Sequence, residues 1–326
     1  MRDYFSRFWF IGALLVAVVM GLLFPHTGQI LNPESVTTTT IVVLVFINLG
    51  LALPFETLGR GILQPRLHLF IQVFIFVIVP VYFYATVFLV RPILTPELIA
   101  GIYALSCLPT TISSCVVLTQ RAGGNAVAAT FNASLSNAIG IVLTPLLLFV
   151  LLRGSGVAPT TSSIPGLFRN LLFQMIIPFS IGLGLQHISG IRIRSIRRYI
   201  DEFNSFLITL IVFFAIANAA MNPSFRRHLN LLPLPLLYLA ISHLVLVFTA
   251  FSLGKVLKFE KDNLITALFV APQKTIALGV PLLTAVFSGN EQLLGIAYLP
   301  LLFYHPWQVL VGAVLSQTAF FSIKKT

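Results

Sequence analysis

The chain has 326 residues, of which 57% are hydrophobic and only 9% are charged, and its mean hydropathy is +0.98. Soluble domains carry about a quarter charged residues, so this composition excludes a soluble globular fold and a disordered chain. The net charge of +11 does not indicate a nucleic-acid partner, because the basic residues are not clustered on a polar domain. A helix crosses a bilayer core with about 20 residues, which leaves room for about ten such helices and short loops.

Ten apolar segments are separated by polar residues or by Pro and Gly. In chain order they cover about residues 8–25, 38–54, 69–90, 97–119, 125–152, 168–187, 200–221, 231–254, 263–287 and 293–318. The first segment has basic residues before it, as a signal peptide has, but it is long and no small-residue cleavage site follows. We therefore predict an all-α, integral, multi-pass membrane protein with ten transmembrane helices in a lipid bilayer.

The distribution of Lys and Arg predicts the orientation, since these residues favour cytoplasmic loops. With the N-terminus inside, fourteen basic residues lie on the inner side and five on the outer side. An even number of helices places the two termini on the same side. We therefore expect both termini to be cytoplasmic.

A half-length offset indicates an internal repeat. The stretches ALSCLPTTIS (104–113) and ALFVAPQKTI (267–276) both fit A-L-x-x-x-P and lie 163 residues apart, half the chain length. The same offset pairs Gly21 with Gly184. The polar break 154–165 would be a linker between repeat one, 1–153, and repeat two, 166–326. Because each half would carry five helices, the second would be inverted, as in many transporters.

Two prolines in the middle of apolar segments are expected to break their helices, because proline lacks a backbone donor. Hydroxyl residues follow Pro109, and a polar triplet follows Pro272. In lipid the freed backbone groups need partners, and paired breaks in two halves point to a midplane binding site. A simple kink is the alternative for Pro109 alone. The candidate site residues beside the breaks are Thr110, Thr111, Ser113, Ser114, Gln273, Lys274 and Thr275.

Lys274 lies near the centre of the ninth segment, too far from either interface for its side chain to reach headgroups. A lysine at this depth costs several kcal/mol unless it lines a cavity or has a partner. No Asp or Glu lies well inside a segment to pair with it. We expect hydroxyls or freed carbonyls of the fourth or fifth helix, or a bound anion, as its partners. We interpret Lys274 as functional, and a structural tether of the broken helix is the alternative.

The fifth segment adds candidates on two faces. At helical spacing Thr130, Ser134 and Asn137 share one stripe, and Asn132 lies on the opposite side. Helix–helix contacts are the alternative role for such small polar residues. We include Thr130, Asn132 and Ser134 among the substrate- or ion-binding candidates.

Other residue types indicate neither a metal site nor an enzyme. Cys107 and Cys115 are too far apart on one helix for a disulfide and have no metal-ligand spacing. His243 and His305 are interpreted as buried, hydrogen-bonded residues in preference to a proton relay. There is no Walker loop, H-E-x-x-H or G-x-S-x-G motif. We therefore expect no catalytic residues, no metal and no cofactor.

The run from 107 to 147, CLPTTISSCVVLTQRAGGNAVAATFNASLSNAIGIVLTPLL, resembles the fourth and fifth helices of the bile acid–sodium symporter family. APQKTIALGVPLL and YHPWQVLVG resemble the branch that contains its seventh human member and bacterial relatives. The resemblance implies an inverted five-plus-five repeat in which discontinuous helices 4 and 9 cross. Helices 3–5 and 8–10 would form a core domain, and helices 1, 2, 6 and 7 a panel domain.

The resemblance also implies site residues. The family's Ser falls on Ser114 and its Gln on Gln273, whereas its Asn falls on Cys115 and its sodium-binding Glu on Phe269. The fifth-helix ligands map near 128–129 and 132–133. The two-sodium arrangement is therefore expected to be incomplete, with Lys274 standing where a cation would sit.

Taken together, these observations predict a secondary transporter of a small organic anion that works by alternating access. Na⁺ is the coupling ion that the resemblance implies, and H⁺ coupling through Lys274 is the alternative. A non-transporting membrane regulator of ion homeostasis, such as that of calcium, is the other function that the branch suggests.

Overall fold

The computed structural model describes residues 2–52, 64–155, 169, 171–188, 193–221, 225, 232–287 and 291–317. Within these residues the elements are helices, and no strand is present. The first half contains α1 (Arg2–Leu23), α2 (Pro25–Leu31), α3 (Val36–Ala52), α5 (Pro65–Val73), the π-helix η2 (Phe74–Ile78), α6 (Val79–Val90), α7 (Pro96–Cys107), α8 (Ser113–Arg121) and α9 (Ala126–Ser155). The second half contains the π-helix η4 (Leu172–Ile176), α11 (Ile177–Ile188), α12 (Ile193–Ala220), α14 (Pro233–Val256), α15 (Lys261–Val270), α16 (Ile276–Val286) and α17 (Glu291–Leu315). Two short 3₁₀ turns, Pro33–Ser35 and Arg91–Ile93, join neighbouring helices.

The described parts of the ten predicted segments are mainly helical, and the fourth and ninth segments are interrupted. Most of the predicted linker 154–165 lies outside the described residues. Six described helices are long and apolar enough to cross a membrane, and a seventh is the pair α1–α2, which is bent by 100°. Three shorter apolar helices are Pro96–Cys107, Leu172–Ile188 and Ile276–Val286. Because every backbone group is bonded within an apolar helix, such elements suit the bilayer core. The chain is an integral, multi-pass membrane protein.

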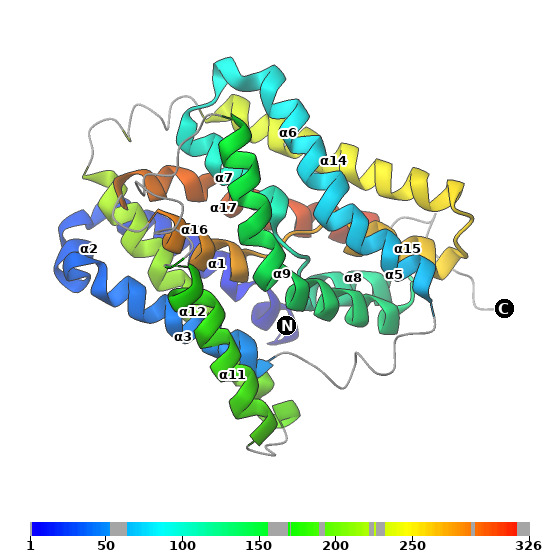
Figure 1. The fold of residues 1–326 in the computed structure, drawn as a ribbon, viewed down its shortest axis with the longest axis horizontal. Coiled ribbons are helices and arrows are strands. Elements are labelled where there is room, and N and C mark those ends of the chain that lie inside the picture. Colours follow the sequence, from blue (N-terminus) through cyan, green and yellow to red (C-terminus); the bar gives the residue numbers. More distant parts are fainter. Residues whose placement is uncertain are drawn as a thin grey trace.

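The helices gather in two groups that meet in the middle of the molecule (Figure 1). α1, α3, α11 and α12 lie together at the lower left of this view, and α5, α8, α14 and α15 lie at the right. The main contacts in the first group are α3 with α11, α1 with α12 and α3 with α12. α7, α9, α16 and α17 lie between the groups, and α17 contacts both α12 and α14.

Close helix contacts depend on glycine in the first group. A Cβ on Gly182 of α11 would overlap the Ile47 carbonyl oxygen, and one on Gly50 of α3 would overlap the Phe179 carbonyl oxygen. Gly21 of α1 packs against α12, where a Cβ would come within 3.0 Å of Ile216. A Cβ on Gly184 would meet nothing within 4 Å. Gly21 and Gly184, paired by the half-length offset, therefore do not have equivalent contacts.

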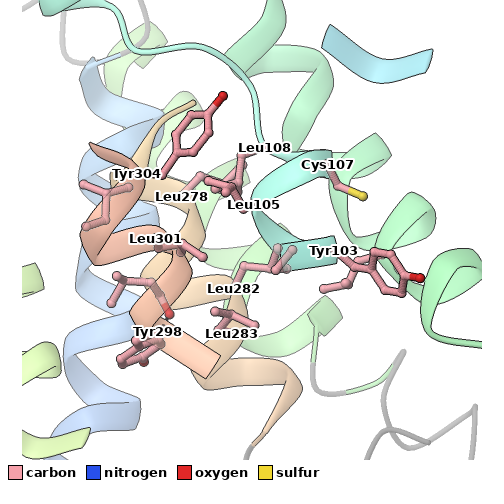
Figure 2. Packing of buried hydrophobic residues seen from close by; sticks show 14 of the residues in the cluster. Tyr103, Leu105, Cys107, Leu108, Leu278, Leu282, Leu283, Tyr298, Leu301 and Tyr304 are labelled. Atoms are coloured by element: carbon pink, nitrogen blue, oxygen red, sulfur yellow. Dashed lines mark hydrogen bonds between the residues drawn. The ribbon is translucent and has the colours of Figure 1, made fainter. Parts of the chain in front are cut away.

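The central apolar core forms where α7, α16 and α17 meet. Figure 2 shows Leu105 and Leu108 at the end of α7 beside Leu278 of α16 and Tyr304 of α17. All four side chains are at most 2% exposed. Side chains in a close-packed interior restrict the ends of short helices. This core holds the interrupted helices next to each other.

Candidate functional site

The fourth and ninth segments are each interrupted by a few non-helical residues. α7 ends at Cys107 and α8 begins at Ser113, while α15 ends at Val270 and α16 begins at Ile276. Each interruption contains the proline that the sequence analysis singled out. The Thr275 backbone N–H donates a 2.9 Å hydrogen bond to the Pro109 carbonyl. The two interruptions are therefore in direct contact, and we call this region the crossing (108–112 and 271–275).

Lys274 points into the protein and is 1% exposed. Its ammonium donates to the carbonyls of Ser106 and Leu108, each at 2.8 Å, and of Ile75 at 3.1 Å. An ammonium has three N–H donors, so all of them are used. The predicted contact with freed carbonyls of the fourth helix is present, but none of the candidate hydroxyls binds the ammonium. This geometry is that of a tether joining α7 and η2 to the ninth segment.

Each of these carbonyls is available because a helix is irregular there. In a continuous helix the Ser106 carbonyl would accept from the Thr110 N–H, but residue 110 is not helical. In the π-helix η2, Val79 donates to Phe74, five residues back. The same pattern would require Pro80 to donate to Ile75, and proline has no N–H. Lys274 therefore replaces donors that the backbone lacks.

Gln273 joins the ninth interruption to the fourth interruption and to the start of α8. Its Oε1 accepts from the Thr111 hydroxyl at 2.7 Å and from the Ser114 hydroxyl at 3.1 Å. The hydroxyl oxygens of Thr111 and Ser114 also lie within hydrogen-bond distance of each other, and the two hydroxyl hydrogens are shared among these three contacts. The crossing therefore brings together three of the predicted site residues in one polar cluster.

Two residues of α17 that the sequence analysis did not select hold the ninth interruption. Gln308 is fully buried; its Oε1 accepts from the Lys274 backbone N–H at 2.8 Å and its Nε2 donates to the Lys274 carbonyl at 2.7 Å. The Tyr304 hydroxyl donates to the Pro272 carbonyl at 3.1 Å. The polar YHPWQ stretch inside an apolar segment was the signal that could have identified Gln308.

The fifth segment, α9, binds the fourth interruption through residues outside the selected set. Asn137 donates to the Thr110 carbonyl at 2.9 Å, and Thr144 donates to the Cys107 carbonyl at 2.9 Å. By contrast, the hydroxyls of Thr130 and Ser134 donate to carbonyls of their own helix. These two residues share the expected stripe with Asn137, but their hydroxyls bond their own helix instead of the crossing.

Asn132 lies in a separate polar cluster between α5 and α9. Its Nδ2 lies 2.9 Å from His68 Nδ1 and donates to Ala128, while Gln72 Nε2 donates to its Oδ1 at 3.3 Å. Its opposite position on the helix, noted in the sequence, accounts for this. Its described contacts are with α5 and its own helix rather than with the crossing.

The remaining candidates differ in their surroundings. Thr275 caps α16, accepting from the Ala277 N–H at 3.3 Å. The Thr110 hydroxyl is buried without a partner among the described residues. Ser113 is exposed at the start of α8, a helix without a side-chain N-cap. The first backbone N–H groups of α8 therefore have no side-chain cap.

Lys274 is the basic side chain of the crossing, and its three carbonyl acceptors suit the ammonium form. Among residues whose burial is described, no Asp or Glu is buried, so Lys274 has no carboxylate beside it. The C-terminal end of α7 offers partial negative charge to the ammonium. Carbonyl dipoles stabilise the ammonium but do not cancel its net charge. Among the described residues, no group of His, Cys, Asp and Glu could hold a metal ion.

The histidines and cysteines lie around this region. His305 Nδ1 lies 3.2 Å from Gln308 Nε2, whereas His243 is 2% exposed and its Nδ1 has no partner among the described residues. The expectation of a hydrogen-bonded His243 is therefore wrong for that nitrogen. Cys107 and Cys115 are both free and buried, in agreement with their sequence spacing.

Comparison with known proteins gives a consistent result. The model of the SBF-like CPA transporter family matches residues 8–319. Sodium/bile acid cotransporter 7-B of Xenopus laevis is 32% identical over 95% of this chain and 91% of its own length. Sodium/bile acid cotransporter 7 of Danio rerio is 32% identical over 94% of this chain and 92% of its own length. An uncharacterized protein of Pseudomonas aeruginosa is 33% identical over 94% and 90%.

The match covers nearly the whole chain and includes both interrupted segments. It confirms the resemblance to the bile acid–sodium symporter family and indicates a transporter rather than an enzyme. The chain belongs to the SBF-like CPA transporter family.

Proposed function

We propose that this protein is a secondary transporter of a small organic anion that works by alternating access. One observation carries the choice of an anion: the buried ammonium of Lys274 is held by carbonyls without a carboxylate. A solute that approaches the crossing meets a net positive charge in a medium of low dielectric, where charge is weakly screened. The uncapped start of α8 adds backbone donors of the same sign.

Exchanging the two halves of the chain supports an inverted repeat with helices 1–5 equivalent to helices 6–10. In this exchange α1, α3, α7, α8 and α9 correspond to η4–α11, α12, α15, α16 and α17, respectively. Under this exchange the contact of α1 with α12 becomes that of α11 with α3, and both are present. Likewise α7 with α16 becomes α15 with α8, and α8 with α9 becomes α16 with α17. The interrupted pairs α7–α8 and α15–α16 and the short pair η4–α11 would complete ten crossings of the bilayer. The proposed core is helices 3–5 and 8–10, and the proposed panel is helices 1, 2, 6 and 7.

Contacts that are present in one half and have no counterpart in the other half support alternating access. α16 packs against both α3 and α12, whereas α8 forms no comparable contact with these helices among the described residues. The panel is thus closed against one half of the crossing and not against the other. Transporters with inverted repeats reach their opposite state by interchanging two such arrangements.

The proposed orientation places both termini in the cytoplasm. Lys255, Lys258 and Lys261 surround the turn between α14 and α15, and Arg121 ends α8. These residues would lie on the cytoplasmic side, where basic residues are favoured. The coupling ion is proposed to be Na⁺ or H⁺, and a dependence on Na⁺ is expected to be weak.

Substrate-dependent stabilisation and uptake test this function. Purified protein would be heated with a panel of organic anions and matched neutral analogues, in sodium and in choline buffers. Anions that raise the melting temperature would then be followed into proteoliposomes as labelled solutes. We expect stabilisation and uptake by one class of anion, and reduced binding in Lys274→Gln, which keeps amide donors but removes the charge. Binding of the neutral analogues in preference to the anions would contradict the proposal.

A further inference from the structure

A small pocket lies behind the crossing, between α14, α15 and α17. Three polar side chains line it, those of His243, Gln273 and Gln308, and the rest of the lining is apolar. The pocket has room for about one water molecule. It shares Gln273 with the crossing, so its contents can affect the contact of that residue with α8.

His243 is the polar group of this pocket that lacks a partner. It is 2% exposed, its ring packs edge-on against Tyr304 at 5.1 Å, and its Nδ1 has no hydrogen bond with a described residue. A buried nitrogen of this kind costs free energy unless water or another ligand satisfies it. The pocket next to it is where that ligand would bind.

The two glutamines of the pocket differ in their freedom. Both ends of the Gln308 amide are bonded to the Lys274 backbone, so turning it over would break both bonds. The oxygen of Gln273 faces Thr111 and Ser114, while its Nε2 lies beside Gly312, a residue of the pocket wall. Hydroxyls both donate and accept, so they can bind either end of the Gln273 amide.

We infer that this pocket is a proton-binding site in which His243 takes up the proton through one water and Gln273 transmits the change to α8. In the neutral imidazole one nitrogen carries a proton and the other accepts. A proton from hydronium adds to the accepting nitrogen, an O–H bond breaks, and water remains. Both ring nitrogens then donate, so the bridging water turns to accept from the ring and needs an acceptor for its own O–H groups. A rotation of the Gln273 side-chain amide by about half a turn would point Oε1 into the pocket and Nε2 toward the hydroxyls of Thr111 and Ser114.

The other ionisable groups near the pocket leave His243 as the proton acceptor. From α17, Tyr304 presents its ring and bonds Pro272, and His305 bonds Gln308. From the ninth interruption, the Lys274 ammonium extends to α7 and η2 and uses all three donors there. On α14 itself, Tyr238 bonds Thr86 and Lys255 lies over the Phe251 ring. Among the residues that line the pocket, His243 is the titratable one.

The inference rests on the proposed function only where it couples the proton to transport, since proton binding itself needs no solute. Nitrogen NMR of protein labelled at histidine rings and glutamine side chains can follow it in lipid nanodiscs. The titration would run from about pH 8 to about pH 4, a range that spans histidines in folded proteins. His243→Gln and Gln273→Leu assign the two signals, and His305→Gln is the matched control.

We expect the His243 ring signals and the Gln273 amide signal to shift along one titration curve. The Gln273 shift should be lost in His243→Gln and retained in His305→Gln. A His243 signal that stays constant, or a Gln273 amide that does not follow it, would overturn the inference. A saturable shift of the Gln273 amide by sodium chloride, absent with choline chloride, would assign the pocket to a metal cation instead. Failure of anion uptake would affect only the proposed function, because none of these signals depends on a solute.

Discussion

The two interruptions that meet at the crossing share the pattern A-L-x-x-x-P, but their backbones have different hydrogen-bonding roles where the two segments touch. The fourth supplies acceptors, because the carbonyls of Leu108, Pro109 and Thr110 all bind donors from other segments. Toward these carbonyls the ninth supplies donors, which are the Lys274 ammonium and the backbone N–H of residue 275. Its side-chain acceptor in this contact is Gln273 Oε1, which binds two hydroxyls of the fourth segment. Two similar breaks therefore form one complementary unit.

The difference shows how unpaired backbone groups can be satisfied in lipid without a water-filled channel. Hydroxyl side chains at both breaks could have satisfied these backbone groups without a charge. The ninth break instead uses a lysine, whose ammonium form would add a positive charge to the crossing. The predictions below test how much of the function and stability depends on this difference.

The largest expected effect concerns sodium. A sodium ion about 4 Å from the ammonium would be repelled by about 4 kcal/mol at an effective dielectric near 20. We therefore expect solute binding or uptake to be nearly equal in sodium and choline buffers. Lys274→Gln removes the charge and should increase the sodium dependence. Uptake in both buffers, at about pH 6 and about pH 8 to include the histidine range, measures it.

The comparison of the two variants decides between coupling ions. A large sodium requirement in the wild type that persists unchanged in Lys274→Gln would show that the ammonium does not exclude the cation. The ordinary sodium-symporter mechanism would then apply.

The second largest effect is expected on stability, when the donors of Lys274 are removed but the volume of its side chain is kept. Lys274→Met leaves the carbonyls of Ile75, Ser106 and Leu108 without their donor, and each unsatisfied buried group costs about 1–3 kcal/mol. We expect a loss of at least about 3 kcal/mol, measured by thermal unfolding in detergent. Lys274→Gln should lose less, because its amide still donates. Equal melting temperatures for Met and wild type would show that the carbonyls find other donors.

Helices and breaks could be predicted from the sequence, because apolar runs and prolines act locally. The described helices and both interruptions lie where such patterns place them. The partners could not, since they depend on which carbonyls three helices bring together. Ile75 carries no polar side chain, and its carbonyl is available only because Pro80 follows a π-turn. Thr130 and Asn137 share a stripe, yet Thr130 bonds its own helix and Asn137 bonds the crossing.

Gln308 gives a smaller effect, because it supports the donor side without carrying charge. Gln308→Leu leaves the Lys274 backbone N–H and carbonyl unpaired, and we expect a loss of about 2 kcal/mol. Gln308→Glu is the informative comparison, because it retains an acceptor for the N–H and adds a carboxylate near the crossing. If the crossing needs its positive charge, this variant should weaken anion binding more than Gln308→Leu does. Thermal unfolding and anion binding together measure the two effects.

The smallest effect is expected at Thr275, where the ninth interruption has a cap that the fourth lacks. Its hydroxyl accepts from the Ala277 N–H at 3.3 Å, whereas α8 has no side-chain cap. Thr275→Val keeps the side-chain shape and the backbone N–H that bonds Pro109, so it removes only the cap. N-caps contribute about 0.5–2 kcal/mol, and the long distance places this one at the lower end. Thr275→Ser, which keeps the hydroxyl, should melt near the wild type. A loss several times larger in Thr275→Val would mean that the hydroxyl has a second partner in another conformation, such as the transported anion.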